Sequence, residues 1–174
     1  MNKKVLKVVT PQGKYPIIIG HNAIADIGTH LKPILKNNRV FIVTSKKVIK
    51  IYKKKLLNIL SKNNIVADLI IINDDEKQKN FNTISKISNT LLKKGIDRND
   101  SLVAFGGGVI GDITGFVSSI ILRGINFIPL KVMLETNPLI SPITPPPKAT
   151  NASFLSIPFF KRAFEIFAIV LKFF

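Results

Sequence analysis

The sequence contains no cysteine and no tryptophan, and it has only ten acidic residues against 26 basic ones. Without cysteine there is neither a disulfide framework nor a thiolate metal site. Residues 1–10 carry three lysines among short apolar stretches, too much charge for a secretory signal, so we expect a cytoplasmic protein. At 174 residues the chain is long enough for one domain with its own core.

The shortage of acidic residues gives a formal net charge of +16, which would suit a polyanion such as nucleic acid. However, lysine, asparagine, isoleucine and phenylalanine dominate the chain, and all four have A/T-rich codons, so base composition supplies much of the excess. The lysines gather in segments 46–62 and 77–94, which have the pattern of solvent faces of helices. We therefore expect no nucleic-acid partner, although a basic surface still attracts phosphorylated small molecules.

Apolar runs alternate with amphipathic segments along the first 127 residues. Short apolar runs predict strands, and apolar residues three and four apart predict helices. The predicted strands are 5–9, 15–20, 39–44, 66–72 and 101–105, and the predicted helices are 23–35, 48–60, 80–94 and about 113–122. Asn22 is a plausible N-cap of the first helix, and Gly95 ends the third. The alternation indicates an α/β, Rossmann-like fold with a mainly parallel sheet and flanking helices.

The segment Phe105–Asp112 (Phe-Gly-Gly-Gly-Val-Ile-Gly-Asp) lies between the apolar run 101–105 and a helix-like segment. This order predicts a phosphate-binding turn, because glycines let the backbone approach a diphosphate and free N–H groups at a helix start favour negative charge. The spacing matches neither GxGxxG nor GxxxxGK[ST]. A plain turn is the alternative, since glycine runs also serve as turns.

Ligands of parallel sheets bind beyond the carboxyl ends of the strands. Three turns follow predicted strands and would meet at that edge: Thr44–Ser45, Asn73–Lys79 and Gly106–Asp112. The sequence therefore predicts a ligand site built from these turns.

Several polar residues of these turns have two interpretations. Asp112 could accept a hydrogen bond from a sugar hydroxyl or cap the helix. Glu76 and Lys79 could contact a nucleotide or form an exposed i,i+3 ion pair. His21 and His30 have no partner at metal-ligand spacing, so we expect neither to bind a metal.

Four segments together carry a resemblance to a known family. They are Asp74–Lys79, Leu91–Arg98, Phe105–Phe116 and Leu122–Phe127. With these segments, residues 1–127 resemble the 3-dehydroquinate synthases, lyases of the shikimate pathway of aromatic amino acid biosynthesis. The glycerol and iron-dependent alcohol dehydrogenases share the glycine turn but look less similar beyond Asp112, so they are one alternative. A stand-alone nucleotide- or polyanion-binding module is another.

The resemblance implies an NAD-binding amino-terminal domain over residues 1–127. The family converts a phosphorylated seven-carbon keto acid into 3-dehydroquinate. NAD oxidises and later reduces the same carbon, phosphate is lost in between, and a divalent metal (Zn or Co) polarises the reacting oxygens. The partners that the resemblance implies for a parent enzyme are a phosphorylated small-molecule substrate, a carboxy-terminal domain and a second copy of the chain.

Residue by residue, the resemblance places the family's nucleotide contacts in two turns. They fall on Asp74, Asp75, Glu76, Lys77, Gln78 and Lys79, and on Gly108, Val109, Ile110, Gly111 and Asp112. Arg123 matches the arginine that binds the substrate phosphate. Asp75 stands where the family often has glycine, which adds negative charge near the cofactor. The resemblance implies no catalytic residue and no metal ligand in this chain.

The resemblance ends at Phe127. The family continues with a threonine pair, an active-site aspartate and lysine, and a helical domain that carries the glutamate and histidines of the metal site. Residues 128–174 contain none of this and instead include three consecutive prolines at 145–147 and an apolar end at 153–174.

The complementary DNA strand explains this different segment. If the tail is read from that strand one base out of register, each tail codon begins with the complements of the second and first bases of a sense codon. Glycine then becomes proline, lysine becomes phenylalanine or leucine, and aspartate becomes serine. Residues whose numbers sum to 253 test this code. Of the 48 pairs from Lys79/Phe174 to Asn126/Phe127, 43 obey it, and the five exceptions involve Ser85, Thr90, Ser101, Thr114 and Ile121.

We therefore expect residues 128–174 to be a non-native tail, a reverse-complement read of the codons for about 79–125. The segment Phe154–Phe174 has the apolar character of a membrane helix or anchor. Its phenylalanines are nevertheless explained as complements of lysine codons, and Pro158, Lys161, Arg162 and Glu165 interrupt the run. We expect no membrane partner.

An inverted copy of this length is typical of a cloning, amplification or assembly artefact. We expect a long, unamplified DNA read through codon 127 of the source DNA to continue into the threonine pair and the rest of a synthase gene. A read that contains the inverted repeat would contradict this expectation and show a genomic rearrangement instead.

Overall fold

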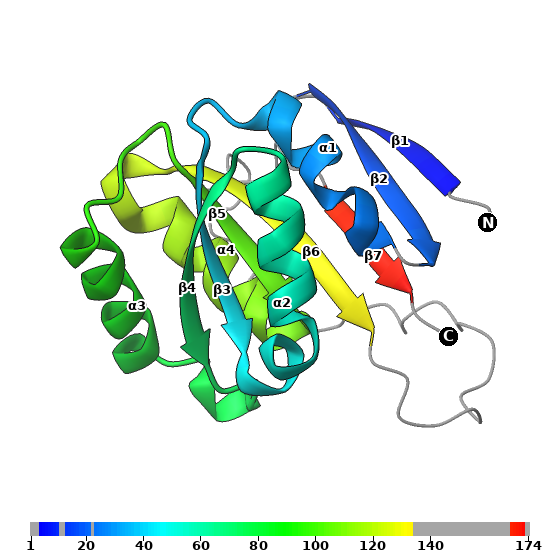
Figure 1. The fold of residues 1–174 in the computed structure, drawn as a ribbon. Helices are drawn as coiled ribbons and strands as arrows, with labels where there is room; N and C mark the ends of the chain where they lie inside the picture. Colours follow the sequence, from blue (N-terminus) through cyan, green and yellow to red (C-terminus); the bar gives the residue numbers. More distant parts are fainter. Residues whose placement is uncertain (1–3, 11–12, 22, 134–167, 173–174) are drawn as a thin grey trace.

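The computed structural model describes residues 4–10, 13–21, 23–133 and 168–172. They form one seven-stranded sheet in the order β1-β2-β7-β6-β5-β3-β4, with helices on both faces (Figure 1). The strands are β1 (Lys4–Thr10), β2 (Gly13–His21), β3 (Arg39–Ser45), β4 (Val66–Ile72), β5 (Ser101–Gly106), β6 (Asn126–Met133) and β7 (Ala168–Lys172). Only β1 and β2 pair antiparallel, and all other neighbours are parallel. The predicted α/β, mainly parallel fold is confirmed.

Within the described residues, four α-helices cover the sheet: α1 (Ile27–Leu31), α2 (Lys46–Lys62), α3 (Phe81–Lys93) and α4 (Gly108–Ile120). Alternate residues of a strand point to opposite faces, so the central strand β3 supplies two cores. Val40 and Ile42 pack with α1 and α2, whereas Phe41 and Val43 pack with α3 and α4. Continuous burial along β3 and β5 is the reason that their sequences are apolar without alternation.

The predicted helices near 48–60 and 80–94 are present, and side chains fix their starts. The Ser45 hydroxyl accepts a hydrogen bond from the Val48 N–H, and the Asn80 side chain accepts one from the Thr83 N–H. At the end of α3, Gly95 has a φ of 65°, and the Ile96 N–H donates to the Leu91 carbonyl. Gly95 therefore ends this helix as predicted, because the left-handed conformation that closes the last turn favours glycine.

The prediction of one helix over 23–35 is wrong. This segment is a 3-10 helix at Ala23–Asp26, the five-residue α1, and a second 3-10 helix at Lys32–Ile34. Pro33 has no N–H to donate to the preceding turn, so the α-helix cannot continue through it. The predicted cap Asn22 lies outside the described residues.

Arg39 holds the amino ends of the strands together. Its guanidinium donates to Asp68 on β4 at 3.1 Å and to the Lys94 and Gly95 carbonyls at 2.7 and 3.1 Å, and it lies over the Phe41 ring. Lys94 also donates to Asp68, and these bonds hold the pKa of Asp68 below its ordinary value. Arg39 thereby joins β3 and β4 to the end of α3.

Asp100 is the buried acceptor in this part of the fold. It is 2% exposed, accepts hydrogen bonds from the Asn37 side chain and the Asp97 N–H, and lies 3.8 Å from the Arg39 guanidinium. We expect Asp100→Ala to lower the free energy of unfolding by about 2–3 kcal/mol, because it removes a buried carboxylate that accepts two part-buried hydrogen bonds and faces the Arg39 guanidinium. Urea denaturation at neutral pH measures this loss.

The control for this prediction is Asp75→Ala, which removes an exposed carboxylate that accepts from the Lys77 N–H. It should cost less than Asp100→Ala by at least about 1 kcal/mol. Equal losses for the two variants would contradict the assignment of Asp100 as the buried acceptor.

Candidate functional site

The carboxyl ends of β3, β4 and β5 lie at one edge of the sheet, because these strands are parallel neighbours. Three turns start there, after Ser45, after Ile72 and after Gly106. The structure thus brings the predicted turns to a common edge, which is where parallel sheets bind ligands.

The turn from β5 into α4 is tighter than the sequence predicts. The helix begins at Gly108, five residues before the predicted start near Ile113. A Cβ at Gly106 would lie 2.8 Å from the Cγ1 of Ile110, so only glycine lets the strand end against the first turn of the helix. Gly107 occupies the N-cap position, and no side chain caps α4. The first N–H groups of α4 therefore lack a side-chain acceptor.

Three other glycines of this turn are not explained by the packing of the described residues. A Cβ at Gly107, Gly108 or Gly111 would meet nothing within 4 Å. None of the three has a positive φ, so backbone conformation does not call for glycine either. Glycine at these positions keeps the surface of the helix start bare.

Asp112 is not the helix cap, because it lies in the second turn of α4. Its carboxylate instead pairs with Lys79 at 2.8 Å, and Lys79 also pairs with Glu76 at 2.6 Å. Of the two interpretations of Glu76 and Lys79, the structure shows the i,i+3 ion pair, and the pair is part of a three-residue bridge. The hydrogen bond to Asp112, followed by that to Glu76, raises the pKa of Lys79 above its ordinary value. This bridge joins the acidic turn to α4.

Other residues of the acidic turn have local roles. Asp75 begins the 3-10 helix Glu76–Gln78, and its carboxylate accepts from the Lys77 N–H at 3.0 Å. Asp74 pairs with Lys47 of α2 at 3.7 Å. The Gln78 side-chain oxygen accepts from the Thr83 hydroxyl at 3.2 Å. The extra charge of Asp75 thus caps a turn, and the acidic segment contacts both α2 and α3.

Two predicted contacts in α4 have apolar side chains with different surroundings. Ile110 is fully buried in the core between the sheet, α3 and α4, whereas Val109 is half-buried and packs against that core. Of Ile110, only the backbone can face a ligand at the helix start.

Arg123 lies far from these residues. It ends the 3-10 helix Ile121–Arg123 that follows α4, just before Asn126, which pairs with Ser101 at the amino end of β5. The glycine turn lies at the carboxyl end of β5, and the 13 residues of α4 separate the two, a length of about 20 Å. Within this chain the structure does not bring Arg123 to the other predicted contacts.

Sequence reasoning missed Thr44 as an individual residue. Thr44 is fully buried at the carboxyl end of β3, beside Phe105 of β5, and its hydroxyl has no hydrogen-bond partner among the described residues. A buried hydroxyl without a partner is unusual and calls for an explanation. The only signal in the sequence was a polar residue at the end of an apolar run.

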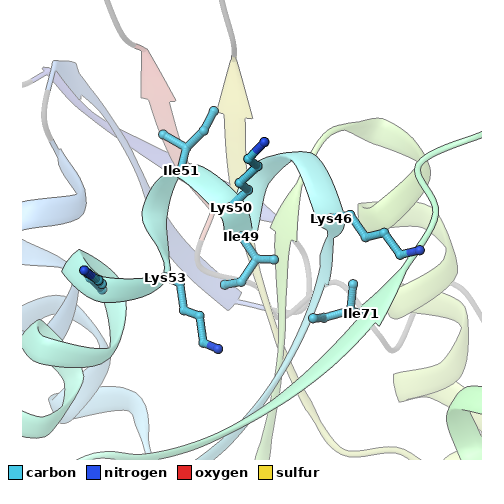
Figure 2. Close-up of a pocket in the computed structure, with 7 residues that line it drawn as sticks. Lys46, Ile49, Lys50, Ile51, Lys53 and Ile71 are labelled. Carbon is cyan, nitrogen blue, oxygen red and sulfur yellow. The ribbon is translucent and has the colours of Figure 1, made fainter.

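A basic cavity was also missed. A hollow of about 360 Å³ lies between α2 and the outer strand β4, and Figure 2 shows the residues that line it. Its lining residues are Lys46, Ile49, Lys50, Ile51, Lys53, Lys54 and Ile71. None of them is a predicted site residue, so the cavity is separate from the glycine turn. Lysines three and four apart in 46–54 were its signal in the sequence.

The described residues offer no metal centre: nowhere among them do three histidine, cysteine, aspartate or glutamate side chains gather so that they could hold a metal ion. The metal of the family therefore does not fit the residues present. Within the same residues, no helix is long and apolar enough to cross a membrane.

Residues 69–136 match the family model of the 3-dehydroquinate synthase N-terminal region, which spans the acidic turn, the glycine turn and Arg123. This part of the chain belongs to the 3-dehydroquinate synthase family. The predicted family is thereby confirmed, and the match continues past Phe127 into β6.

Individual relatives agree with the family match. The chain is 38% identical over 136 residues to the 3-dehydroquinate synthase of Prochlorococcus marinus subsp. pastoris, covering 77% of this chain and 38% of that protein. It is 44% identical over 120 residues to the one of Buchnera aphidicola subsp. Baizongia pistaciae, covering 69% and 34%. The chain therefore spans little more than a third of the length of these synthases.

Solved structures share the fold. A 2-deoxy-scyllo-inosose synthase complexed with carbaglucose-6-phosphate, NAD⁺ and Co²⁺ superposes with a TM-score of 0.64 at 15% identity, over 74% of this chain and 35% of that one. At this identity the likeness concerns the fold alone.

The bridge at Lys79 leads to a prediction. Lys79→Met should speed amide hydrogen exchange in residues 76–80, because the acidic turn loses its bond to Asp112. The matched control Lys77→Met removes an exposed lysine of the same turn and should leave the exchange unchanged. The raised pKa of Lys79 means that its contribution to stability is complete below the unfolded pKa of about 10.4 and is lost as the pH rises through the folded value. Equal exchange in both variants at neutral pH would contradict the bridge.

Proposed function

We propose that this chain is the NAD-binding portion of a 3-dehydroquinate synthase, that it binds NAD at the carboxyl edge of the sheet, and that it has no turnover by itself. The observation that carries the proposal is the bare start of α4. Glycine at 107, 108 and 111 meets no requirement of packing or conformation within the described residues, so we attribute it to the approach of a ligand.

The diphosphate of NAD fits the first turn of α4. The N–H groups there have no side-chain cap, and the helix dipole favours negative charge at this end. The backbone N–H groups of Gly108, Val109 and Ile110 would bind the diphosphate. Gly108 has no Cβ that could obstruct its approach to the helix start.

Carboxylates supply the polar contacts that a ribose needs. Asp112 lies one turn into α4 with its side chain 64% exposed, so a sugar hydroxyl can donate to it. Lys79 pairs with that carboxylate and with Glu76, which holds both side chains in place. The unpartnered hydroxyl of Thr44 is a further group that would find a partner in a ligand at this edge.

The reaction itself requires more than this chain holds. In the family, bound NAD supplies the acceptor and donor of a hydride, and a divalent metal of the full-length enzyme activates the substrate. The described residues hold no metal centre, and the active-site lysine of the family lies in the part that the sequence departs from. We therefore propose binding without turnover. The phosphorylated substrate, the carboxy-terminal domain and a homodimer belong to the parent enzyme.

Arg123 remains our proposed contact of the substrate phosphate. Its place beyond the far end of α4 means that the phosphate and NAD sites are separate within this chain. A change at Arg123 should therefore leave NAD binding intact, which makes it a control for changes at the glycine turn.

We expect Gly108→Val to weaken NAD binding by about tenfold or more, because its side chain would occupy the bare surface at the helix start. The fold should survive, since the new Cβ meets nothing within 4 Å and the backbone there has no positive φ. Isothermal titration with NAD measures the affinity, and thermal unfolding checks the fold.

Arg123→Ala is the matched control and should bind NAD as the unchanged chain does. If Gly108→Val binds NAD with unchanged affinity, the helix start is not the diphosphate site. If the unchanged chain does not bind NAD at all but binds DNA with a steep dependence on salt, the polyanion-binding alternative is favoured instead.

A further inference from the structure

β7 has an unusual position in both the sheet and the sequence. It lies between β2 and β6 and pairs with both in parallel, Ile17–His21 with Ala168–Lys172 on one side and Leu130–Met133 with Ile169–Lys172 on the other (Figure 1). It is thus a central strand, although it comes from the segment that the sequence identifies as an inverted copy. Without it, β2 and β6 would each present an unpaired edge.

The two strands that flank β7 both contribute buried residues to the core. Leu130 and Val132 on β6 are 1% and 5% exposed, and Ile18 on β2 is 4% exposed. A strand placed between them completes the hydrogen bonding of both neighbours. An empty position would leave a gap in the middle of the sheet, with backbone groups of both strands open to solvent.

The complementary code explains how an unselected segment can serve as such a strand. The second base of each tail codon is the complement of the first base of a sense codon. Codons that begin with A, such as those of asparagine, threonine and isoleucine, therefore give T at the second position, and T there encodes only phenylalanine, leucine, isoleucine, methionine or valine. Asn82, Thr83 and Ile84 accordingly correspond to Leu171, Val170 and Ile169.

These residues have the composition that a central parallel strand requires. Strands covered on both faces are continuous apolar runs rather than alternating ones, and β-branched residues favour them. Ala168-Ile-Val-Leu171 is such a run. No selected pattern of polar and apolar positions is needed, so base composition alone can supply the occupant.

We propose that the space between β2 and β6 is a strand-accepting site for an extended apolar segment in parallel orientation, and that residues 168–172 occupy it as a surrogate strand, of which residues 169–172 are encoded by the complement of codons 81–84. The main-chain bonds of β2 and β6 provide affinity, as they do wherever a segment is added to a sheet edge. The site closes the sheet of residues 4–133 with a segment that was not selected for it.

Paired cysteines test the register directly, because the chain has no cysteine of its own. Ile18 and Ile169 are Cα partners in the β2–β7 pair, whereas Ile18 and Lys172 are three positions out of register. Adjacent strands lie about 4.8 Å apart, within the range that a disulfide spans. Under mild oxidation of the full chain, Ile18→Cys with Ile169→Cys should form the intramolecular disulfide, and Ile18→Cys with Lys172→Cys should not.

A proline variant tests the contribution of the strand. Val170 pairs with Ile19 of β2 and with Lys131 of β6. Val170→Pro removes its N–H from the ladder and should lower the thermal midpoint of the full chain by roughly 5–10 °C. Ala163→Pro, which lies in the tail outside the strand, is the control and should leave the midpoint within about 2 °C.

A synthetic peptide with the sequence of residues 166–174, added to the Val170→Pro chain, should raise its midpoint again, because the peptide can enter the vacated site. Equal cross-linking of the two cysteine pairs, or none in either, would overturn the proposal. An unchanged midpoint in Val170→Pro would overturn it as well. Because the cross-linking uses the folded chain without proline, a variant that fails to fold does not remove the test.

Discussion

The contact between Gly106 and Ile110 positions the whole candidate site. Because no side chain separates the end of β5 from the first turn of α4, the helix starts directly at the carboxyl edge of the sheet. The uncapped helix start therefore lies at the edge where β3 and β4 also end. Any larger residue at 106 would place its Cβ 2.8 Å from the Cγ1 of Ile110, so the strand end and the helix start could not stay as close as they are. Gly107, Gly108 and Gly111 are free of this packing constraint. Gly106 is therefore the structural glycine of the turn, and the other three leave the surface of the helix start bare.

The few acidic residues are concentrated at the two ends of the strands. Asp68 and Asp100 bind Arg39 at the amino ends, where they connect strands to the end of α3. Asp74 and Asp112 bind lysines at the carboxyl ends, where they connect the acidic turn to α2 and α4. In a chain with a large excess of lysine, carboxylates are the scarce partner. Their positions therefore mark the places where an ion pair connects two elements of the fold.

The sequence predicts the elements with strong patterns and misses those decided by tertiary contacts. The strands around Val40 and Leu102 were predictable because both faces are covered, which makes the run continuously apolar. The α4 start was placed too late, since glycine is a poor helix former and only the contact with Gly106 shows that the helix includes Gly108. The broken helix near Pro33 has a plain local cause that the apolar spacing concealed. The bridge from Lys79 to Asp112 was not predictable, because it joins residues 33 positions apart through the packing of two turns. The position of β7 was likewise beyond sequence patterns.

The basic cavity beside β4 has a consequence for how copies of this chain meet one another. β4 is the outer strand of the sheet, and Val66 and Ile71 on it are 63% and 49% exposed. An open, apolar edge strand is a template for pairing with another chain. Four lysines line the same cavity as Ile71, so a second copy that approaches this edge brings like charges together (Figure 2). Electrostatic repulsion thus opposes the pairing of β4 with the same strand of a second copy. The Debye length falls from about 10 Å at 0.1 M salt to about 3 Å at 1 M, so salt screens this repulsion. Association of two copies through the β4 edge therefore depends on ionic strength.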